Sequence, residues 1–295
     1  SRAVIVPTAE RDPAIGVSIF GPVFRAARAI MYNSFEERAL IQAASGNAGV
    51  PNVVVGVGSE VPERTDPARF RRKHGLFSPF VVYVGRIDEN KGCQELFGFF
   101  ERYARAVPGD LSLVLMGNSI LPIPDHPRIR HLGFVSDEDK FDGIAAADAL
   151  VMPSYYESLS MVALEAWALG KPVLANGRCD VLQGQCLRSN AGLFYENEDE
   201  FIETLALLQR NRRLAEAMGR NGREYYRRHY DWPVIVRKYL DMFDRLRRED
   251  ASGGPRPGIE PLPGWLARLR KDRPAAARVV EALPSGPVRR QERHR

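Results

Sequence analysis

The sequence predicts an α/β fold, with a parallel sheet covered by helices on both faces. From residue 80 onward, short β-rich apolar runs alternate with stretches of helical length, which is typical of right-handed βαβ units. The length of 295 residues favours two domains, and the hydrophobic content of 44% suffices for ordinary globular cores. No apolar run reaches the roughly eighteen residues of a membrane-spanning helix.

The expected elements follow one another from residue 80 to residue 247. The run FVVYVG is typical of a buried strand, and further apolar runs of similar length recur after helical stretches. Strands are expected at 80–85, 111–117, 129–134, 149–154 and 172–177, and helices at 92–106, 137–147 and 159–169. Residues 197–247 are expected to be helical throughout, with Pro233 in the first turn of the last helix.

The residues before 80 predict the closing part of another α/β unit. The pieces AVIVP, AIMYNSFEERALIQAA and VVVGVG are too few to make a sheet by themselves. The chain begins with SRAVIV, without an initiator Met and inside an apolar run, which favours a fragment or a processed chain. We therefore expect a partial N-terminal domain followed by one complete domain.

The net charge of +5 at pH 7 comes from the end of the chain. Residues 251–295 hold ten Lys or Arg residues against four acids, so residues 1–250 carry about −1. This Pro- and Arg-rich end has no sustained apolar periodicity beyond WLARLRK, so its composition predicts a disordered or linker-like tail.

The cysteines and histidines favour no metal site. The three cysteines, Cys93, Cys179 and Cys186, are spaced neither as zinc ligands nor as a disulfide framework, which favours a reducing, cytoplasmic setting. The five histidines show no ligand spacing either.

The loop VGRIDENKGC, residues 84–93, follows an expected strand and carries two cations. In open parallel sheets, ligands bind beyond the carboxyl ends of the strands. Gly85 ends the strand and Gly92 allows close approach of the chain, while Arg86 and Lys91 could hold an anion. The alternative is a surface loop in which these cations form salt bridges with the acids of the same loop.

The segment ESLSMVALE, residues 157–165, places a glutamate at each end of an uncharged stretch. Along a helix this spacing is about 12 Å, wider than the roughly 5 to 9.5 Å of glycosidase carboxylate pairs. The free N–H groups of the helix start, with its positive dipole end, predict an anion site around Ser158, Leu159, Ser160 and Met161. A diphosphate could bind there, with Glu157 holding the hydroxyl groups of a sugar on one side and Glu165 those of a ribose on the other. A nucleotide sugar is the ligand with this layout. The alternative is a helix with a solvated acid at its start and another on its wet face.

These residues resemble a known family. The GRIDENKG loop, the two glutamates with seven residues between them, and the following ALGKPVLA are similar to the donor-binding domain of retaining glycosyltransferases of family 4, which have the GT-B fold. The resemblance covers about residues 1–247.

The resemblance implies a role for each matching residue. Arg86 and Lys91 would bind the donor diphosphate, while Glu157 would contact the transferred sugar and Glu165 the ribose. Backbone from His131 to residue 135 would meet the base. The resemblance implies that a sugar is transferred from a nucleotide-diphosphate sugar to a saccharide or lipid-linked acceptor, with retention of the anomeric configuration. It further implies that the reaction needs neither a metal nor a cofactor, and that it serves the synthesis of cell-envelope polysaccharide.

The resemblance also implies a domain plan. We expect the end of an acceptor domain at 1–60, the donor-binding domain at 61–230, a crossover helix at 231–250 and the tail at 251–295. Two places depart from the family pattern. Glu10 and Arg11 stand where relatives often carry His before Asp, and residues 178–184 lack the usual paired glycine and glutamate, so sugar recognition there is expected to differ.

Two other interpretations remain open at this point. The chain could be a non-catalytic nucleotide-sugar-binding or scaffold protein without a working acceptor domain. The basic tail is either solubilising or a peripheral contact with the inner face of an anionic membrane. Nucleic acid is not expected as a partner, because the tail lacks interleaved aromatic residues. A dinucleotide oxidoreductase is disfavoured because VGRIDEN stands in place of the G-x-G-x-x-G turn.

Overall fold

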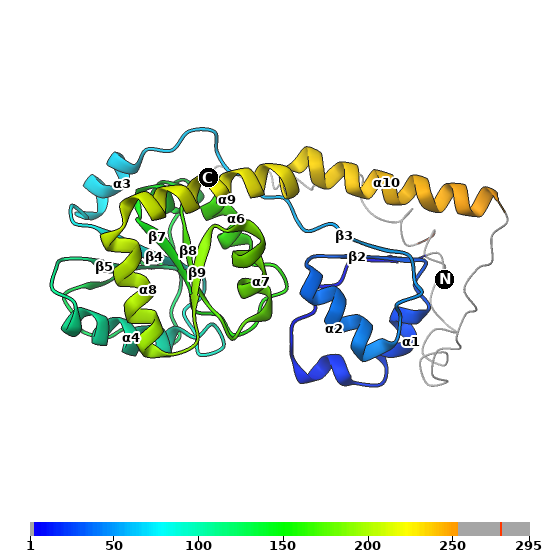
Figure 1. The fold of residues 1–295 in the computed structure, drawn as a ribbon, viewed down its shortest axis with the longest axis horizontal. Helices are drawn as coiled ribbons and strands as arrows, with labels where there is room; N and C mark the ends of the chain where they lie inside the picture. Colours follow the sequence, from blue (N-terminus) through cyan, green and yellow to red (C-terminus); the bar gives the residue numbers. More distant parts are fainter. Residues whose placement is uncertain (1–2, 253–277, 279–295) are drawn as a thin grey trace, which may run out of the picture.

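The computed structural model describes residues 3–252 and residue 278, and it contains two parallel sheets (Figure 1). The first sheet has three strands in the order β1-β2-β3, and the second has six in the order β6-β5-β4-β7-β8-β9. All strand pairs are parallel. The expected fold class is confirmed.

The first sheet is built from residues 4–54. Its central strand β2 is buried along its whole length, and Ser34 caps the following helix by accepting a hydrogen bond from the Glu37 N–H. The elements are β1 (Val4–Ile5), η1 (Pro13–Gly16), α1 (Phe20–Arg25), β2 (Ala29–Tyr32), α2 (Phe35–Ser45) and β3 (Asn52–Val54). Ile30 and Tyr32 face a core shared with α1 and α2, whereas Ala29 and Met31 face the opposite side.

The second sheet has helices on both faces because its strands are apolar on both faces. One face packs on α4 and α8, and the other on α5, α6 and α7. The elements are α3 (Pro67–His74), β4 (Phe80–Val84), α4 (Cys93–Ala106), β5 (Ser112–Met116), β6 (Ile129–His131), α5 (Asp137–Ala146), β7 (Ala149–Met152), α6 (Met161–Ala168), β8 (Val173–Asn176), α7 (Asp180–Ser189), β9 (Gly192–Tyr195), α8 (Glu198–Arg210) and α9 (Arg212–His229).

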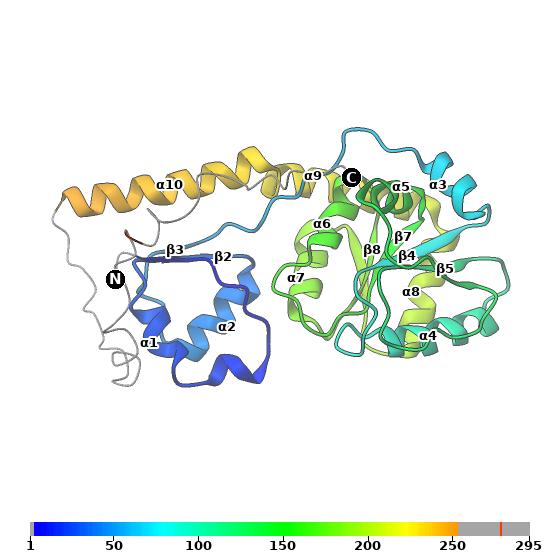
Figure 2. The ribbon, with the colours of Figure 1, turned by 180° about the vertical axis from the view of Figure 1, so that it is seen from behind.

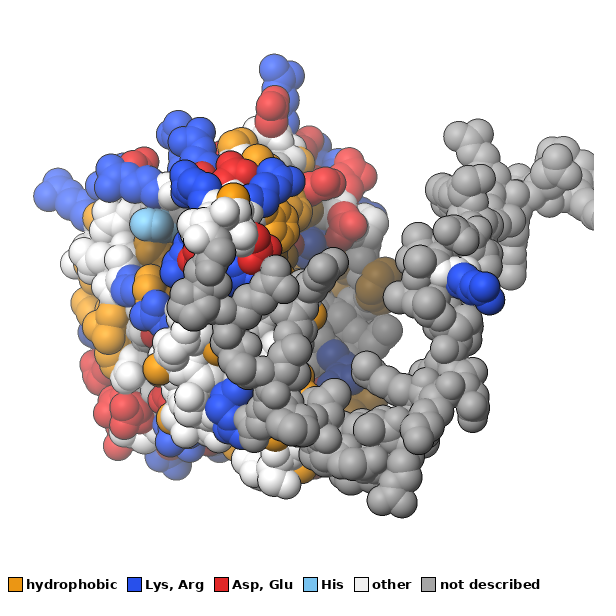
Figure 3. All heavy atoms as spheres, turned by 90° about the vertical axis from the view of Figure 1, so that its right-hand side faces the viewer, with side chains coloured by type: hydrophobic (Ala, Val, Ile, Leu, Met, Phe, Trp, Pro, Cys, Tyr) orange, Lys and Arg blue, Asp and Glu red, His pale blue; other side chains and the backbone are white. Residues whose placement is uncertain are grey.

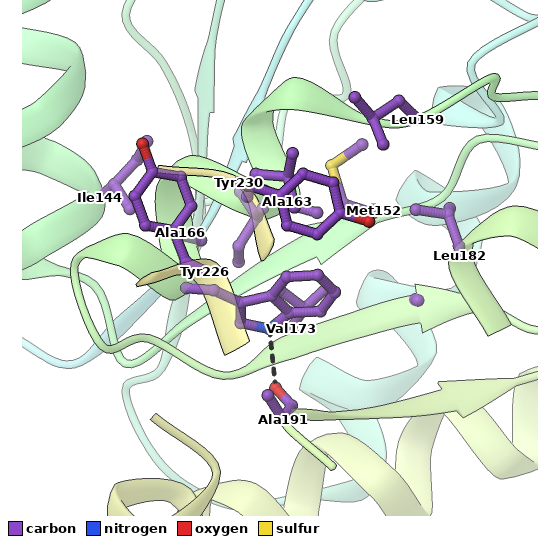
Figure 4. Close-up of a cluster of buried hydrophobic side chains, with 14 of the residues drawn as sticks. Ile144, Met152, Leu159, Ala163, Ala166, Val173, Leu182, Ala191, Tyr226 and Tyr230 are labelled. Carbon is purple, nitrogen blue, oxygen red and sulfur yellow. Dashed lines mark hydrogen bonds between the residues drawn. The ribbon is translucent and has the colours of Figure 1, made fainter. Parts of the chain in front are cut away.

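Helix α6 is fixed inside one of these cores. Figure 4 shows Ala163 and Ala166 of α6 packed beside Met152 of β7 and Val173 of β8. The Trp167 indole N–H donates to the Ala191 carbonyl oxygen at 3.0 Å. Trp167 is therefore a core residue, and α6 is packed against the sheet along its apolar face.

The expectation for residues 197–247 is confirmed, because this stretch consists of α8, α9 and α10, with Pro233 in the first turn of α10. Several expected boundaries were wrong. Strand β6 ends at His131 instead of residue 134, and α6 begins at Met161 instead of residue 159. Helix α7 and edge strand β9 were not anticipated at all.

Helix α10 (Trp232–Ala251) returns from the second sheet to the first (Figures 1 and 2). Its buried residues Ile235, Met242 and Leu246 lie in the same core as Ala29 and Met31. The Arg28 guanidinium bonds Glu249 at 2.9 Å and Asp250 at 3.1 Å. Helix α10 thus covers one face of the first sheet, although it follows the second sheet in the sequence.

The end of the molecule at α10 carries charges of both signs. Figure 3 shows basic and acidic side chains intermixed there, and two of the pairs are Arg245 with Glu249 and Arg247 with Asp244. Within residues 3–252, no helix is both long and apolar enough to cross a bilayer. The expected tail and its membrane contact fall on residues 251–295, nearly all of which lie outside the described residues.

Candidate functional site

Three loops meet at the carboxyl edge of the second sheet, and two glycines permit this contact. Gly117 has φ 140°, and a Cβ there would lie 2.0 Å from the Gly85 carbonyl oxygen. Gly92, the N-cap residue that precedes α4, has φ 69°, and a Cβ there would lie 2.2 Å from the Pro153 carbonyl oxygen. The loop with the two cations is therefore packed directly against the loop that leads to α6.

The two cations have different partners. Arg86 donates through Nε to Asp88, and its side chain is 66% exposed. Buried Asp88 also accepts from the Lys91 N–H at 2.8 Å, which closes the loop. The Lys91 ammonium group instead donates to the Glu157 carboxylate at 2.9 Å. The salt bridge within the loop is thus present for Arg86, while Lys91 reaches the second loop.

The start of α6 holds polar atoms without partners. Ser160, the N-cap residue, has φ 67° and ψ 85° and makes no side-chain cap bond. The buried Oγ atoms of Ser154 and Ser160 have no hydrogen-bond partner among the described residues. Leu159 is buried, and its carbonyl oxygen accepts from the Gln185 amide at 2.7 Å, which holds the turn in place. Unpaired hydroxyls and free helix N–H groups suit an anion.

The separation of the two glutamates has to be corrected. Glu157 lies in the loop before α6, because the helix begins only at Met161, so the helical rise does not measure its distance to Glu165. The two carboxylates nevertheless have separate environments. Glu157 bonds Lys91, whereas Glu165 bonds Lys140 at 3.1 Å and the Ser59 hydroxyl at 2.9 Å.

Glu165 is a buried carboxylate with unused capacity. It is 6% exposed, and its Oε1 atom accepts both hydrogen bonds from Ser59 and Lys140. Its Oε2 atom is buried and has no partner in the part of the chain that the structure describes. A buried polar atom without a partner costs free energy, which a ligand hydroxyl would offset. The alternative interpretation, in which Glu165 lies on the wet face of a helix, is wrong, because this carboxylate is buried.

Two adjoining cavities extend from this edge. One of about 320 Å³ is lined by Gly85, Arg86, Gly117, Asn118, Phe134, Val135, Asp137 and Lys140, among others. The other, of about 590 Å³, lies between the segment 59–64 and α5 and reaches Glu165. Asp137 and Lys140 line both. His131 lies at the end of β6, and its Nε2 is 2.8 Å from the Gly117 carbonyl oxygen.

Sequence reasoning missed Lys140 and Ser59. Lys140 lies in the first turns of α5, directly after Asp137, Glu138 and Asp139. In the sequence, a lysine next to three acids is typical of a charged, solvent-exposed helix surface. Its ammonium group is instead directed to Glu165 and stacks 4.1 Å over the Phe141 ring centroid. Ser59 carried no signal, because its contact with Glu165 spans 106 residues.

A third cavity, of about 40 Å³, lies between the two sheets. We call the first sheet with its helices the first unit, and the second sheet with its helices the second unit. The cavity is lined from the first unit by Ala9, Arg11, Glu36, Glu37 and Leu40, and from the second unit by Tyr155, Tyr156, Glu157, Arg178, Cys179, Asp180 and Val181. Burial raises the pKa of the Glu37 carboxyl to about 7. Hydrogen bonds donated by the backbone N–H groups of Asn33 and Ala9 lower this pKa, but the effect of burial is larger. Arg178, in the segment where the sequence departs from the family pattern, bonds Glu95 and lies over the Tyr155 ring.

A protein family and several curated proteins match this chain in sequence. The family model described as glycosyl transferases group 1 matches residues 66–225, more than half of the chain. D-inositol 3-phosphate glycosyltransferase of Corynebacterium efficiens is 28% identical over 204 residues, which are 63% of this chain and 48% of that protein. Glycogen synthase of Mycobacterium tuberculosis is 26% identical over 189 residues, 60% of this chain and 45% of that protein. The chain thus spans about half the length of these curated relatives.

Solved structures share the fold. Sucrose-phosphate synthase from Thermosynechococcus elongatus aligns with a TM-score of 0.67 at 23% identity, over 78% of this chain and 61% of that chain. Anabaena HepE in complex with UDP aligns with a TM-score of 0.71 at 18% identity, over 83% of this chain and 72% of that chain. The arrangement of the two sheets is the GT-B arrangement expected from the sequence.

Proposed function

Because the chain belongs to the glycosyl transferases group 1 family, we propose that it transfers a sugar from a nucleotide-diphosphate sugar to a hydroxyl acceptor. The observation that carries the proposal is the set of unpartnered atoms at one edge of the second sheet. The Oγ atoms of Ser154 and Ser160 and the Oε2 atom of Glu165 are buried, and none has a partner among the described residues.

The layout of the site suits the three parts of such a donor. The diphosphate lies at the start of α6, where Arg86 and Lys91 supply charge-assisted bonds. The ribose hydroxyls bond the free Oε2 atom of Glu165. The base occupies the cavity of about 320 Å³ that reaches Phe134 and Val135.

Catalysis in this proposal rests on stabilising the leaving group. As the bond between the sugar and the diphosphate breaks, negative charge grows on the diphosphate oxygen. The cations and the N–H groups of α6 face that position before the reaction begins, which lowers the barrier electrostatically. Glu157, held by Lys91, contacts the transferred sugar, and transfer proceeds with retention and without a divalent metal.

The acceptor enters between the two sheets. The cavity of about 40 Å³ is too small to hold a sugar, but it marks the side on which Glu157 faces residues that follow the strands of the first sheet. Several similar proteins carry names that describe transfer to inositol phosphate or to a phosphatidylinositol mannoside. We propose a saccharide or lipid-linked acceptor for this chain.

Calorimetric titration with a panel of nucleoside diphosphates, followed by turnover of the matching nucleotide sugars, tests the proposal. We expect Glu165→Gln to weaken binding of the free diphosphate, and Glu157→Gln to leave that binding nearly intact while reducing transfer. The anomeric configuration of the product, measured by NMR, tests retention, and turnover in EDTA tests metal independence. If no diphosphate binds, the proposal is wrong; binding without any transfer would favour a non-catalytic nucleotide-sugar-binding protein.

A further inference from the structure

Ser59 forms hydrogen bonds with two helices that cover the second sheet, α6 and α9. It belongs to residues 55–59, which leave β3 toward α3 and which we call the linker. Its hydroxyl donates to the Glu165 Oε1 atom at 2.9 Å, and its carbonyl oxygen accepts from the Tyr226 hydroxyl at 2.7 Å. One linker residue therefore contacts α6 through its side chain and α9 through its backbone.

The linker also lies against the second crossing of the chain between the sheets, at residues 230–232 (Figure 2). A Cβ at Gly56 would lie 2.7 Å from the Tyr230 ring, and one at Gly58 would lie 2.6 Å from the Trp232 ring. The Lys238 ammonium group donates to the Val55 carbonyl oxygen at 3.0 Å. The linker and the start of α10 are therefore in direct contact.

The Glu165 carboxylate can hold the linker and a ligand at once. A carboxylate oxygen accepts more than one hydrogen bond, and Oε1 already serves both Ser59 and Lys140. The Oε2 atom is free of partners within residues 3–252. A hydroxyl ligand bound there leaves the bond to Ser59 intact, so ligand, carboxylate and linker form one continuous chain of contacts.

We propose that Ser59 is a positioning residue of the donor site, which orients Glu165 toward the ribose and joins nucleotide binding to the linker between the sheets. The inference rests on the proposed function for the assignment of the ribose to Glu165. Ser59 touches no reacting atom; it acts through Glu165.

Matched ligands separate this role from a general structural one. The probe is whichever of UDP, GDP and ADP binds the wild type most tightly, compared with its 2′,3′-dideoxy counterpart. We expect Ser59→Ala to weaken binding of the ribose diphosphate about tenfold and binding of the dideoxy compound hardly at all, because the lost orientation matters only for the hydroxyls. Ser59→Thr keeps a hydroxyl and should keep the affinity. Equal losses for both ligands, or no loss, would overturn the inference.

A distance measurement tests the connection to the linker. Spin labels at Ala43→Cys in α2 and Glu203→Cys in α8 report on the two sheets, since the three native cysteines are buried. We expect the diphosphate to narrow the distance distribution in the wild type and in Ser59→Thr, and not in Ser59→Ala. The same narrowing in Ser59→Ala, or none in the wild type, would contradict the connection. A wild type that binds none of the three diphosphates would overturn the proposed function itself and this inference with it.

Discussion

Lys91 and Glu157 lie in different loops, yet their charged groups are 2.9 Å apart. In the proposed donor site this ion pair would give Lys91 two roles: to contact the diphosphate, and to hold Glu157 near the transferred sugar. Arg86 has the first role alone, because its partner Asp88 lies in its own loop. The two cations of one motif are therefore not equivalent.

Substitution of these cations is the first prediction. We expect Arg86→Ala and Lys91→Ala each to weaken binding of a nucleoside diphosphate by about ten- to a hundredfold, because each removes a charge-assisted hydrogen bond worth about 1.5 to 3 kcal/mol. Binding of the nucleoside should change little, and calorimetry with both ligands measures the difference. Arg72→Ala in α3 is the control, since this exposed residue lines none of the three cavities described above. Equal losses for diphosphate and nucleoside would refute the assignment.

Glu37 makes stability depend on pH. Burial raises the pKa of this carboxyl from 4.5 to about 7 in the folded protein. A raised pKa means that its contribution is fully present below pH 4.5 and is lost as the pH rises through about 7. Between pH 4.5 and pH 7.5 we expect the wild type to lose about 3 kcal/mol of unfolding free energy relative to Glu37→Gln, which has no carboxyl group to ionise.

Urea unfolding across this pH range measures the effect. Glu63→Gln, at an exposed position in the segment before α3, is the matched control and should follow the wild type. Parallel curves for Glu37→Gln and the wild type would show that the pKa of Glu37 is the same in the folded and unfolded states.

The sequence allowed some site residues to be predicted and not others, for a physical reason. Arg86, Lys91, Glu157 and Glu165 follow strands of one parallel sheet, and the carboxyl ends of such strands meet at one edge, so their proximity could be inferred. The bond of Ser59 to Glu165 depends on how the linker passes over the second sheet. No local pattern encodes that path.

At the scale of elements, the buried strands were the easiest to predict. β4 and β7 are uniformly apolar runs of four or five residues, as expected for strands covered on both faces. Strand β9 at the sheet edge is only partly buried, and α7 contains a glycine and few apolar residues. Both elements are specified by packing against their neighbours, which a single sequence does not display.

The contact between the loop before α4 and Pro153 gives the third prediction. Gly92→Ala should destabilise the fold by about 2 kcal/mol or more, since the residue has φ 69° and its Cβ would meet the Pro153 carbonyl oxygen at 2.2 Å. Gly98→Ala lies within the same helix with nothing within 4 Å of its Cβ, so it should be neutral or stabilising. Urea denaturation of both variants provides the comparison. Equal stabilities would mean that the two loops can separate without cost.

For the whole molecule, α10 is the element that joins the last residues of the fold to the first. Ile235 of α10 is 1% exposed and lies in the core, whereas Leu240 of the same helix is 55% exposed. We expect Ile235→Ala to cost about 2 to 4 kcal/mol of unfolding free energy, and Leu240→Ala to cost less than about 0.5 kcal/mol. Chemical denaturation measures both. Similar costs would indicate that α10 contributes little to the stability of the first sheet.

The docking of α10 also has a consequence for synthesis on the ribosome. Ala29 and Met31 of the first sheet share a core with Ile235 and Met242, and Arg28 bonds Glu249 across 221 residues of sequence. At a translation rate of about 5 to 20 residues per second, that interval lasts roughly 10 to 40 seconds. During this time the face of the first sheet that carries Ala29 and Met31 lacks its cover of α10, so we expect chaperones that recognise exposed apolar surfaces to bind the nascent chain until α10 emerges.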